Sequence, residues 1–225
     1  MNLRWPSQRA LREIGIIAAI VAVVSIVVRT FLFQVFYVPS VSMNDTLQVN
    51  DKIVASKFAL TTDGIRRGDV VVFHDPGGWL AVPPQPNALQ WLFQRPLEII
   101  GLLPNQPGED LVKRVIGVAG DHVVCCNPAG RIMVNGHALD ERTYTLGDSS
   151  AVPFDIRVPD HRIFVMGDNR HQSADSRFHL DVESGTVDVG EVRGIVIATI
   201  WPISRFGSVP APAALTSAAL NQPIS

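Results

Sequence analysis

A long apolar run near the start of the chain limits what this sequence can fold into. Residues 14–28 read IGIIAAIVAVVSIVV and carry no charged side chain. At about 1.5 Å per residue, a helix over this run alone is shorter than a hydrocarbon core roughly 30 Å thick. The segment TFLFQVFYV follows closely, and its aromatic side chains suit the headgroup boundary and extend the run. The sequence therefore predicts one transmembrane helix over residues 13–33.

The charges before this run predict its orientation. Three arginines precede it against a single glutamate. By the positive-inside rule, residues 1–12 remain in the cytoplasm and the chain from residue 34 onward is extracytoplasmic. A cleavable signal peptide also has a basic start and an apolar middle, but no Ala-x-Ala-like site follows the run before the polar part of the chain. An uncleaved, single-pass anchor in the plasma membrane is favoured.

Short β-branched runs dominate residues 34–208, the expected extracytoplasmic domain. These runs are DKIVASKFAL, GDVVVF, DLVKRVIGVAGDHVV, GRIMVNGHALD, RIFVMGD and GEVRGIVIATIW. Their composition and length are typical of strands. The Asn-Gly pair at 135–136 predicts a hairpin, because both residues tolerate a positive φ. The fold class is therefore mainly β.

Two segments interrupt this pattern. Residues 75–109 are dense in proline and glycine, and they predict an inserted loop with one short amphipathic helix, which either lies near the membrane surface or packs as a surface excursion. Residues 209–225 read VPAPAALTSAALNQPIS, which is too polar and too interrupted by proline to span a bilayer, and they predict a disordered tail. The net charge of −2 and the absence of a basic cluster exclude nucleic acid as a partner.

The two cysteines, Cys125 and Cys126, are adjacent in the sequence. An exported domain permits disulfides, so a bridge between neighbours, bonds to thiols elsewhere and reduced thiols are all compatible with this pattern. The usual zinc spacings are absent, and we expect no metal and no organic cofactor.

Two serines, Ser40 and Ser42, lie in the motif VPSVSM directly after the expected anchor. A serine needs a base to become a nucleophile, and histidine is the usual one. The sequence has six histidines, but it contains neither a G-x-S-x-G nor an H-E-x-x-H motif. His171 has the most suitable neighbours, but its polar surroundings favour a solvated loop residue.

A lysine can replace histidine as the base when burial lowers its pKa toward neutrality. Strand alternation places Lys113 on the same face as Leu111 and Val115, so its neighbours are apolar. A buried base and an edge lysine whose amine reaches solvent are both compatible with this pattern. Lys52 and Lys57 are typical of surface positions.

Four motifs in order resemble those of bacterial type I signal peptidases, the membrane-anchored serine–lysine proteases of the S26 family. They are VPSVSM, RGDVVVF, LVKRVIGVAGD and GDNRHQSADSR, and with the strands between them they cover most of residues 29–206. The resemblance implies a signal-peptidase-like β catalytic core with an extended β-ribbon lobe. It also implies that the chain cleaves signal peptides from exported preproteins after small residues, as in Ala-x-Ala, at the surface of the lipid bilayer.

The resemblance also assigns roles to individual residues. Ser42 matches the nucleophile and Lys113 the general base, while Ser40 matches a hydroxyl that helps to form the oxyanion hole. Ser173 matches the serine that orients the lysine, supported by the polar pair Asp175 and Arg177. The residues that match the lining of the substrate pockets are Phe36, Val38, Met43, Leu47 and Val112.

The chain departs from the family pattern at two places. Asp45 stands where the family has proline, and His171-Gln172 stands where the family has an acidic residue and asparagine. The departures leave open an alternative function, in which a catalytically impaired, membrane-tethered β-domain binds exported peptides without cutting them. A self-cleaving repressor on a related fold is disfavoured, because such proteins are soluble and carry a DNA-binding region.

Overall fold

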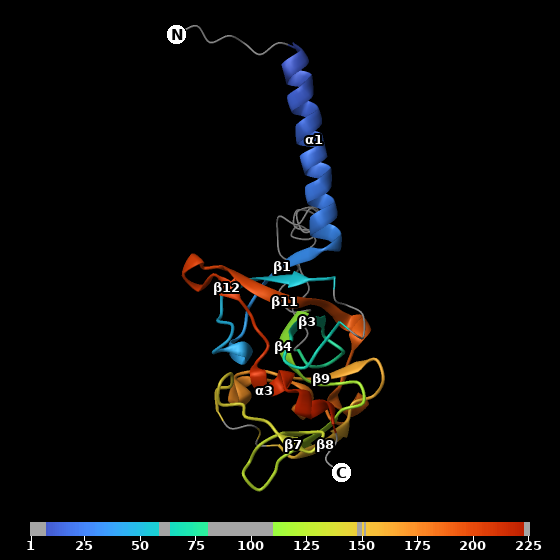
Figure 1. Cartoon of the computed structure of the whole chain (residues 1–225), viewed down its shortest axis with the longest axis vertical. Helices are drawn as coiled ribbons and strands as arrows, with labels where there is room; N and C mark the ends of the chain where they lie inside the picture. Colours follow the sequence, from blue (N-terminus) through green and yellow to red (C-terminus); the bar gives the residue numbers. More distant parts are fainter. Residues whose placement is uncertain (1–7, 59–63, 81–109, 148–149, 151, 223–225) are drawn as a thin grey trace.

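A long N-terminal helix leads into a β-rich body (Figure 1). The computed structural model describes residues 8–58, 64–80, 110–147, 150 and 152–222. The helix is α1 (Gln8–Phe31), and β1 follows it directly. Over these described ranges, no helix combines the length and the apolar character that crossing a bilayer requires. The transmembrane segment at residues 13–33 stays a prediction.

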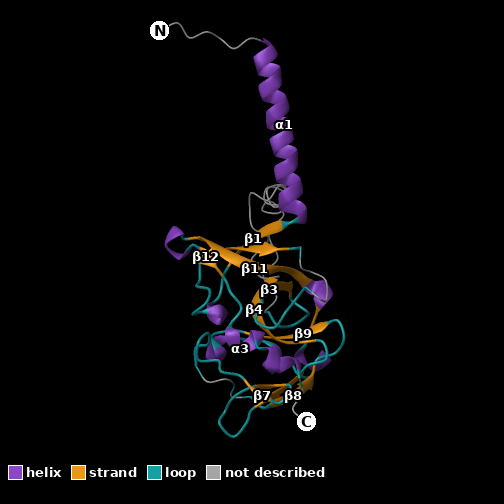
Figure 2. Ribbon diagram, in the orientation of Figure 1, coloured by secondary structure: helices purple, strands orange, loops and turns teal. Residues whose placement is uncertain are grey.

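Eight strands form the main sheet, the larger of the two sheets in the described part of the body (Figure 2). They are β1 (Phe33–Tyr37), β2 (Lys52–Ser56), β3 (Val70–His74), β4 (Asp110–Val118), β9 (Arg162–Met166), β10 (Val187–Asp188), β11 (Val192–Trp201) and β12 (Gly207–Ser208). The order is β1-β2-β11-β3-β4-β9-β10, with β12 beside β11, and all of these pairs are antiparallel. The mainly β class is confirmed.

A second, four-stranded sheet lies at the end of the body farthest from α1 (Figure 1). Its strands are β5 (His122–Cys125), β6 (Met133–Val134), β7 (His137–Ala138) and β8 (Phe154–Arg157), in the order β7-β6-β5-β8. The expected Asn-Gly hairpin joins β6 to β7, with φ of 51° at Asn135 and 85° at Gly136. That this sheet forms the extended β-ribbon lobe implied by the resemblance stays a prediction.

Single 3-10 turns connect many of the strands. They are η1 (Val41–Met43), η2 (Arg170–Gln172), η3 (Ser176–Phe178), η4 (Glu183–Gly185), η5 (Val189–Glu191), η6 (Ile203–Arg205) and η7 (Ala218–Asn221).

Strand β4 is a central strand of the main sheet and contributes side chains to three apolar clusters of the core. It lies between β3 and β9, and all seven of its interior residues are buried. Leu111 and Val115 belong to one apolar cluster, Val112 to a second and Ile116 to a third. Because both faces of β4 are covered, any polar side chain on it is removed from solvent.

The C-terminal segment corrects one prediction. Residues 209–222 are not a disordered tail, because a short helix, α3 (Ala213–Thr216), and η7 place Leu215 and Leu220 in the core against residues such as Phe164. The proline content of the segment suggested disorder, but its two leucines bury enough apolar surface to fix the chain. Its polar and proline residues lie where solvent reaches them.

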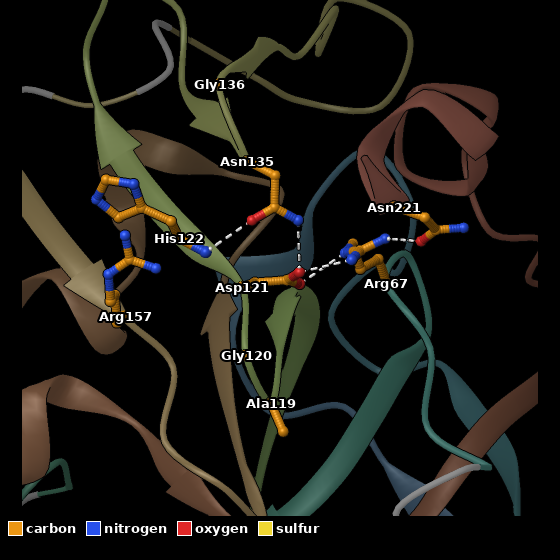
Figure 3. A pocket seen from close by; sticks show the side chains of 9 residues that line it. All are labelled: Arg67, Ala119, Gly120, Asp121, His122, Asn135, Gly136, Arg157 and Asn221. Atoms are coloured by element: carbon orange, nitrogen blue, oxygen red, sulfur yellow. Dashed lines mark hydrogen bonds and ion pairs between the residues drawn. The ribbon is translucent and has the colours of Figure 1, made fainter. Parts of the chain in front are cut away.

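Hydrogen bonds tie this C-terminal segment to both sheets (Figure 3). Arg67 donates to both carboxylate oxygens of Asp121 and to Oδ1 of Asn221 at 2.8 Å. Asn135 Nδ2 donates to Asp121 at 2.8 Å and to the carbonyl of Leu220 at 2.7 Å. These side chains line a polar cavity of about 540 Å³, and most of their polar atoms already bond to one another. The network therefore fastens the segment in place.

The expected insertion at residues 75–109 is described only at its start. Asp75 accepts hydrogen bonds from the backbone N–H groups of Gly77, Trp79 and Leu80. The ring of Trp79 stacks on His179 at a centroid distance of 4.6 Å. The amphipathic helix expected in this insertion lies outside the described residues.

Candidate active site

The turn that carries Ser42 is hydrogen-bonded to Asn169, a residue far away in the sequence. Ser42 lies in η1, just after β1, and is 5% exposed. Its backbone carbonyl accepts a hydrogen bond from the N–H of Asn169 at 3.0 Å, and Asn169 Nδ2 donates to the carbonyl of Val41 at 3.1 Å. The position of the Ser42 hydroxyl therefore depends on the loop of residues 167–173, which follows β9.

The structure brings Ser42 and Lys113 together. Lys113 Nζ donates a hydrogen bond to Ser42 Oγ at 2.6 Å, although the two residues are far apart in the sequence. Lys113 is 2% exposed and lies in the middle of β4. The alternative of an edge lysine is wrong, because β4 is flanked by strands on both sides.

Burial changes the protonation of this lysine. Desolvation lowers the pKa of Lys113 to about 8, from 10.5. The negative charge of Asp175 opposes this shift, the positive charge of Arg177 adds to it, and Asp168 opposes it. An amine with this pKa is partly neutral near pH 7 to 8 and is able to accept a proton from Ser42.

The buried charges around the lysine are paired with one another. The pairs are Arg114 with Asp168, Arg170 with Glu141, and Arg177 with Asp175, with closest N–O distances of 2.6 to 2.8 Å. Each carboxylate thus has an arginine of its own. Within the described part of the chain, Lys113 forms no ion pair, so no carboxylate holds it in the charged form by direct contact.

Ser173 and Asp175 form a buried hydrogen-bonded pair beside this centre. Ser173 Oγ donates to Asp175 Oδ2 at 2.7 Å. Burial raises the pKa of the Asp175 carboxyl, but hydrogen bonds from Arg177, Gly167 and Ser173 outweigh burial and hold it below its ordinary value. Over the described residues no hydrogen bond joins Ser173 to Lys113, so the role of Ser173 in orienting the lysine stays a prediction.

Ser40 lies next to the nucleophile candidate. Its Oγ is 3.2 Å from Ser42 Oγ, as the spacing of two residues in an extended chain suggested. Ser40 is exposed, so its hydroxyl is accessible to a bound peptide. Its part in an oxyanion hole is not tested by this geometry.

The expected pocket residues gather in one apolar cluster. Phe36, Val38, Met43, Leu47 and Val112 are all buried, and they pack together with Ile53, Ala55, Val70, Val72 and Val196. The cluster includes Met43, the neighbour of Ser42, and Val112, the neighbour of Lys113. Their assignment as pocket lining stays a prediction.

Sequence reasoning missed several residues that hold the site. Gly167 lies so close to Ser42 and Ser173 that a Cβ atom would be 2.5 Å from the Ser42 carbonyl and 2.3 Å from Ser173 Oγ. Asp168 accepts from Arg114 at 2.6 and 2.8 Å and from Thr46 Oγ1 at 2.6 Å. The only sequence signal was the GDNR motif, whose partners Ser42, Thr46 and Arg114 are distant in the sequence.

The structure shows the backbone conformation at Asp45 and the contacts of His171 and Gln172, the positions where the chain departs from the family pattern. Asp45 has a φ of 89°, which proline does not adopt because its ring fixes φ near −65°. The turn after Ser42 therefore has a conformation that excludes proline. Gln172 Oε1 accepts a hydrogen bond from Asn169 Nδ2 at 3.1 Å and so contributes to the loop that holds Ser42. His171 is exposed beside Gly147.

Cys125 and Cys126 are joined by a disulfide, so the bridge between neighbours is the alternative that the structure contains. In the described ranges, no group of three His, Cys, Asp or Glu side chains is placed to hold a metal ion.

Comparison with known proteins identifies the family. The model of the signal peptidase family, peptidase S26, matches residues 11–201. The chain belongs to this family. The resemblance carried by the four motifs is confirmed, and the chain is a serine endopeptidase of the signal peptidase I type.

Curated members of the family match most of this chain. Signal peptidase I of Mycobacterium tuberculosis (strain ATCC 25618 / H37Rv) is 37% identical, over 91% of this chain and 77% of that protein. The probable signal peptidase I of Mycobacterium leprae is 36% identical over 91% of this chain and 81% of its own length. Signal peptidase I of Leptolyngbya laminosa is 30% identical, over 92% of this chain and 86% of that protein.

A solved structure also resembles the chain, at low similarity. The signal peptidase I of Enterococcus faecalis V583 covers 58% of this chain and 95% of its own, at 22% identity and a TM-score of 0.36.

Proposed function

We propose that this protein removes signal peptides from exported preproteins by acyl transfer through Ser42 and Lys113. The observation that carries the proposal is the 2.6 Å hydrogen bond between Lys113 Nζ and Ser42 Oγ in a site where both residues are buried. A lysine with a pKa of about 8 is a suitable general base, and no histidine is needed.

The reaction follows from this pair. Neutral Lys113 takes the Ser42 proton while Ser42 Oγ attacks the carbonyl carbon of the scissile peptide bond. The negative charge on the carbonyl oxygen is stabilised by the Ser42 backbone N–H and the Ser40 hydroxyl. The lysine then gives its proton to the leaving amine, and an ester to Ser42 remains. Water, deprotonated by the same lysine, hydrolyses this ester and restores Ser42.

The proposed substrates carry small residues at the first and third positions before the scissile bond. The support is the tight packing of the apolar cluster next to Ser42, in which all five expected pocket residues are nearly covered by their own neighbours. Side chains that are already covered by their neighbours would leave little room for a substrate side chain, which would favour alanine over larger residues. An extended peptide would bind across it by strand addition.

We also propose that the protein works at the outer surface of the plasma membrane, anchored by residues 13–33. The apolar run and the preceding arginines support this topology. The β-rich body adds a second observation, because large apolar side chains are exposed on β1, on β11 and on the turn η6 that follows β11. Strands β1 and β11 lie at the end of the body nearest α1 (Figure 1). The exposed side chains are Phe33, Val35, Tyr37, Ile197, Trp201, Ile203 and Phe206. A bilayer surface is a suitable partner for these side chains.

The test uses the full chain in detergent and a secretory preprotein with an Ala-x-Ala site. We expect mass spectrometry to find cleavage after the last alanine with the wild type, and none with Ser42→Ala or Lys113→Ala. Chelators should have no effect on the rate. Cleavage by either variant at the wild-type rate would contradict the serine–lysine mechanism. Binding without cleavage by the folded wild type would favour the peptide-binding alternative.

A further inference from the structure

The segment of residues 139–147, which follows β7, contributes a buried carboxylate near the active site. Glu141 is 4% exposed, and its Oε1 accepts hydrogen bonds from Arg170 at 2.6 Å and from the Tyr144 hydroxyl at 2.9 Å. Its Oε2 is buried and has no hydrogen-bond partner among the described residues. A buried carboxylate with an unused oxygen costs folding free energy, so stability alone does not explain its presence.

Arg170 transmits the position of Glu141 to the loop of residues 167–173. Arg170 Nε donates to the carbonyl of Gly167 at 3.0 Å. The backbone N–H of Arg170 donates to the carbonyl of Leu146 at 3.0 Å, and the N–H of Leu146 donates to the carbonyl of Asp168 at 2.8 Å. The segment that carries Glu141 is therefore bonded to this loop through both side chain and backbone.

The same loop contacts the proposed reacting groups on its other side. Asn169 bonds to the carbonyl of Ser42, and Gly167 is in close contact with both Ser42 and Ser173. The contacts leave no free space at Gly167, so a shift of the loop moves Ser42 or Ser173 with it. The ring of Tyr144 also lies 5.2 Å from the guanidinium of Arg114, the neighbour of Lys113 on β4.

We infer that Glu141 is a positioning residue for the Ser42–Lys113 reaction. It acts through Arg170, which fixes the loop of residues 167–173 against the turn that carries Ser42. Glu141 touches neither the substrate nor the reacting atoms. This inference rests on the proposed function, because the geometry that it maintains is that of the proposed serine–lysine pair.

The decisive variant is Glu141→Gln, which keeps the size and one acceptor oxygen but removes the charge that holds Arg170. Asp140→Asn is the matched control, since the neighbouring Asp140 pairs with Arg142 at similar distances but both side chains are exposed. We expect Glu141→Gln to lower kcat about tenfold or more with KM changed less than about twofold, because the substrate surface is intact and the reacting groups are not. Asp140→Asn should keep both constants.

Two further variants separate positioning from stability. Leu139→Ala removes a buried side chain from the adjacent core, so it should lower Tm and leave kcat per folded molecule unchanged. Tyr144→Phe removes one of the two hydrogen bonds on Glu141 Oε1 and should lower kcat about threefold at constant KM. If Glu141→Gln does not fold, the kcat of Tyr144→Phe tests whether Glu141 positions the reacting groups.

All variants are assayed as the full chain in detergent, at a temperature where thermal unfolding shows each one to be folded. Wild-type kcat in folded Glu141→Gln, or in Tyr144→Phe if the first variant is unfolded, would overturn the inference. A change confined to KM would overturn it as well. In either case, an inactive Ser42→Ala would leave the proposed function intact, whereas an active one would contradict the proposed function itself.

Discussion

Replacing Lys113 by methionine should stabilise the protein while abolishing its activity. The amine of Lys113 lies in the interior of the main sheet, where burial lowers its pKa from 10.5 to about 8. Methionine has a similar length and no charge. The substitution thus removes the amine, whose charged form is costly to bury, and leaves an apolar side chain of similar length in its place.

The magnitude follows from the pKa difference. About 2.5 pH units correspond to a penalty of about 3 kcal/mol at 1.36 kcal/mol per unit. Below pH 8 the folded and unfolded chains both hold the proton, and the folded state carries the whole penalty. Between about pH 8 and 10.5 the folded chain loses its proton first, so the penalty falls to about 2 kcal/mol at pH 9 and disappears above 10.5.

The lost hydrogen bond to Ser42 offsets about 1 kcal/mol of the gain. We therefore expect Lys113→Met to raise the free energy of unfolding by about 2 kcal/mol at pH 7 and by about 1 kcal/mol at pH 9. Urea unfolding of the full chain in detergent, followed by tryptophan fluorescence at both pH values, measures this difference.

Lys52→Met is the control, because Lys52 is an exposed lysine on a strand of the same sheet. Its effect should remain within about 0.5 kcal/mol. A Lys113→Met protein that is less stable than the wild type at pH 7, or whose gain is the same at both pH values, would refute the argument that desolvation sets the pKa of this lysine.

Three further predictions concern the reaction, the core and the membrane. Since Lys113 must be neutral to act as a base, kcat/KM should rise about tenfold between pH 7 and pH 9 for a pKa near 8, and a flat profile would contradict this role. Leu215→Ala should lower the free energy of unfolding by about 3 kcal/mol, measured in urea, because it leaves a cavity in the core; an unchanged midpoint would show that the segment is not packed there. In a chain shortened to begin at Phe33, Phe206→Ser should weaken sedimentation with lipid vesicles about tenfold, and Ser204→Ala, on the same turn, should not; equal binding by both would argue against membrane contact at this surface.

The sequence was informative where structure depends on local patterns. The β-branched runs correspond to strands, and the Asn-Gly pair forms the expected hairpin because its conformation is set by two adjacent residues. Alternation along β4 also placed Lys113 among apolar neighbours. It did not show that Lys113 is buried, because burial depends on the strands on either side of β4 and on the side chains that cover its faces, and both come from segments far apart in the chain.

The parts of the site that were not predicted depend on partners distant in the sequence. Glu141 carries no local mark of a supporting role, and Asp168 carries only its place in the GDNR motif; each gains its role from an arginine on another element. The C-terminal segment was misjudged for a related reason. Its composition indicates disorder, but Leu215 and Leu220 fit a space that only the assembled sheets create.

The position of these two leucines determines when the core can be completed during synthesis. Residues 209–222 complete a core whose other members come from strands made much earlier, and Leu220 also accepts a hydrogen bond from Asn135. The body cannot finish folding until residue 220 has left the ribosome and, in the proposed topology, has crossed the bilayer. A chain stalled in the translocation channel before residue 220 emerges would present Ser42 and Lys113 on a scaffold whose core still lacks Leu215 and Leu220.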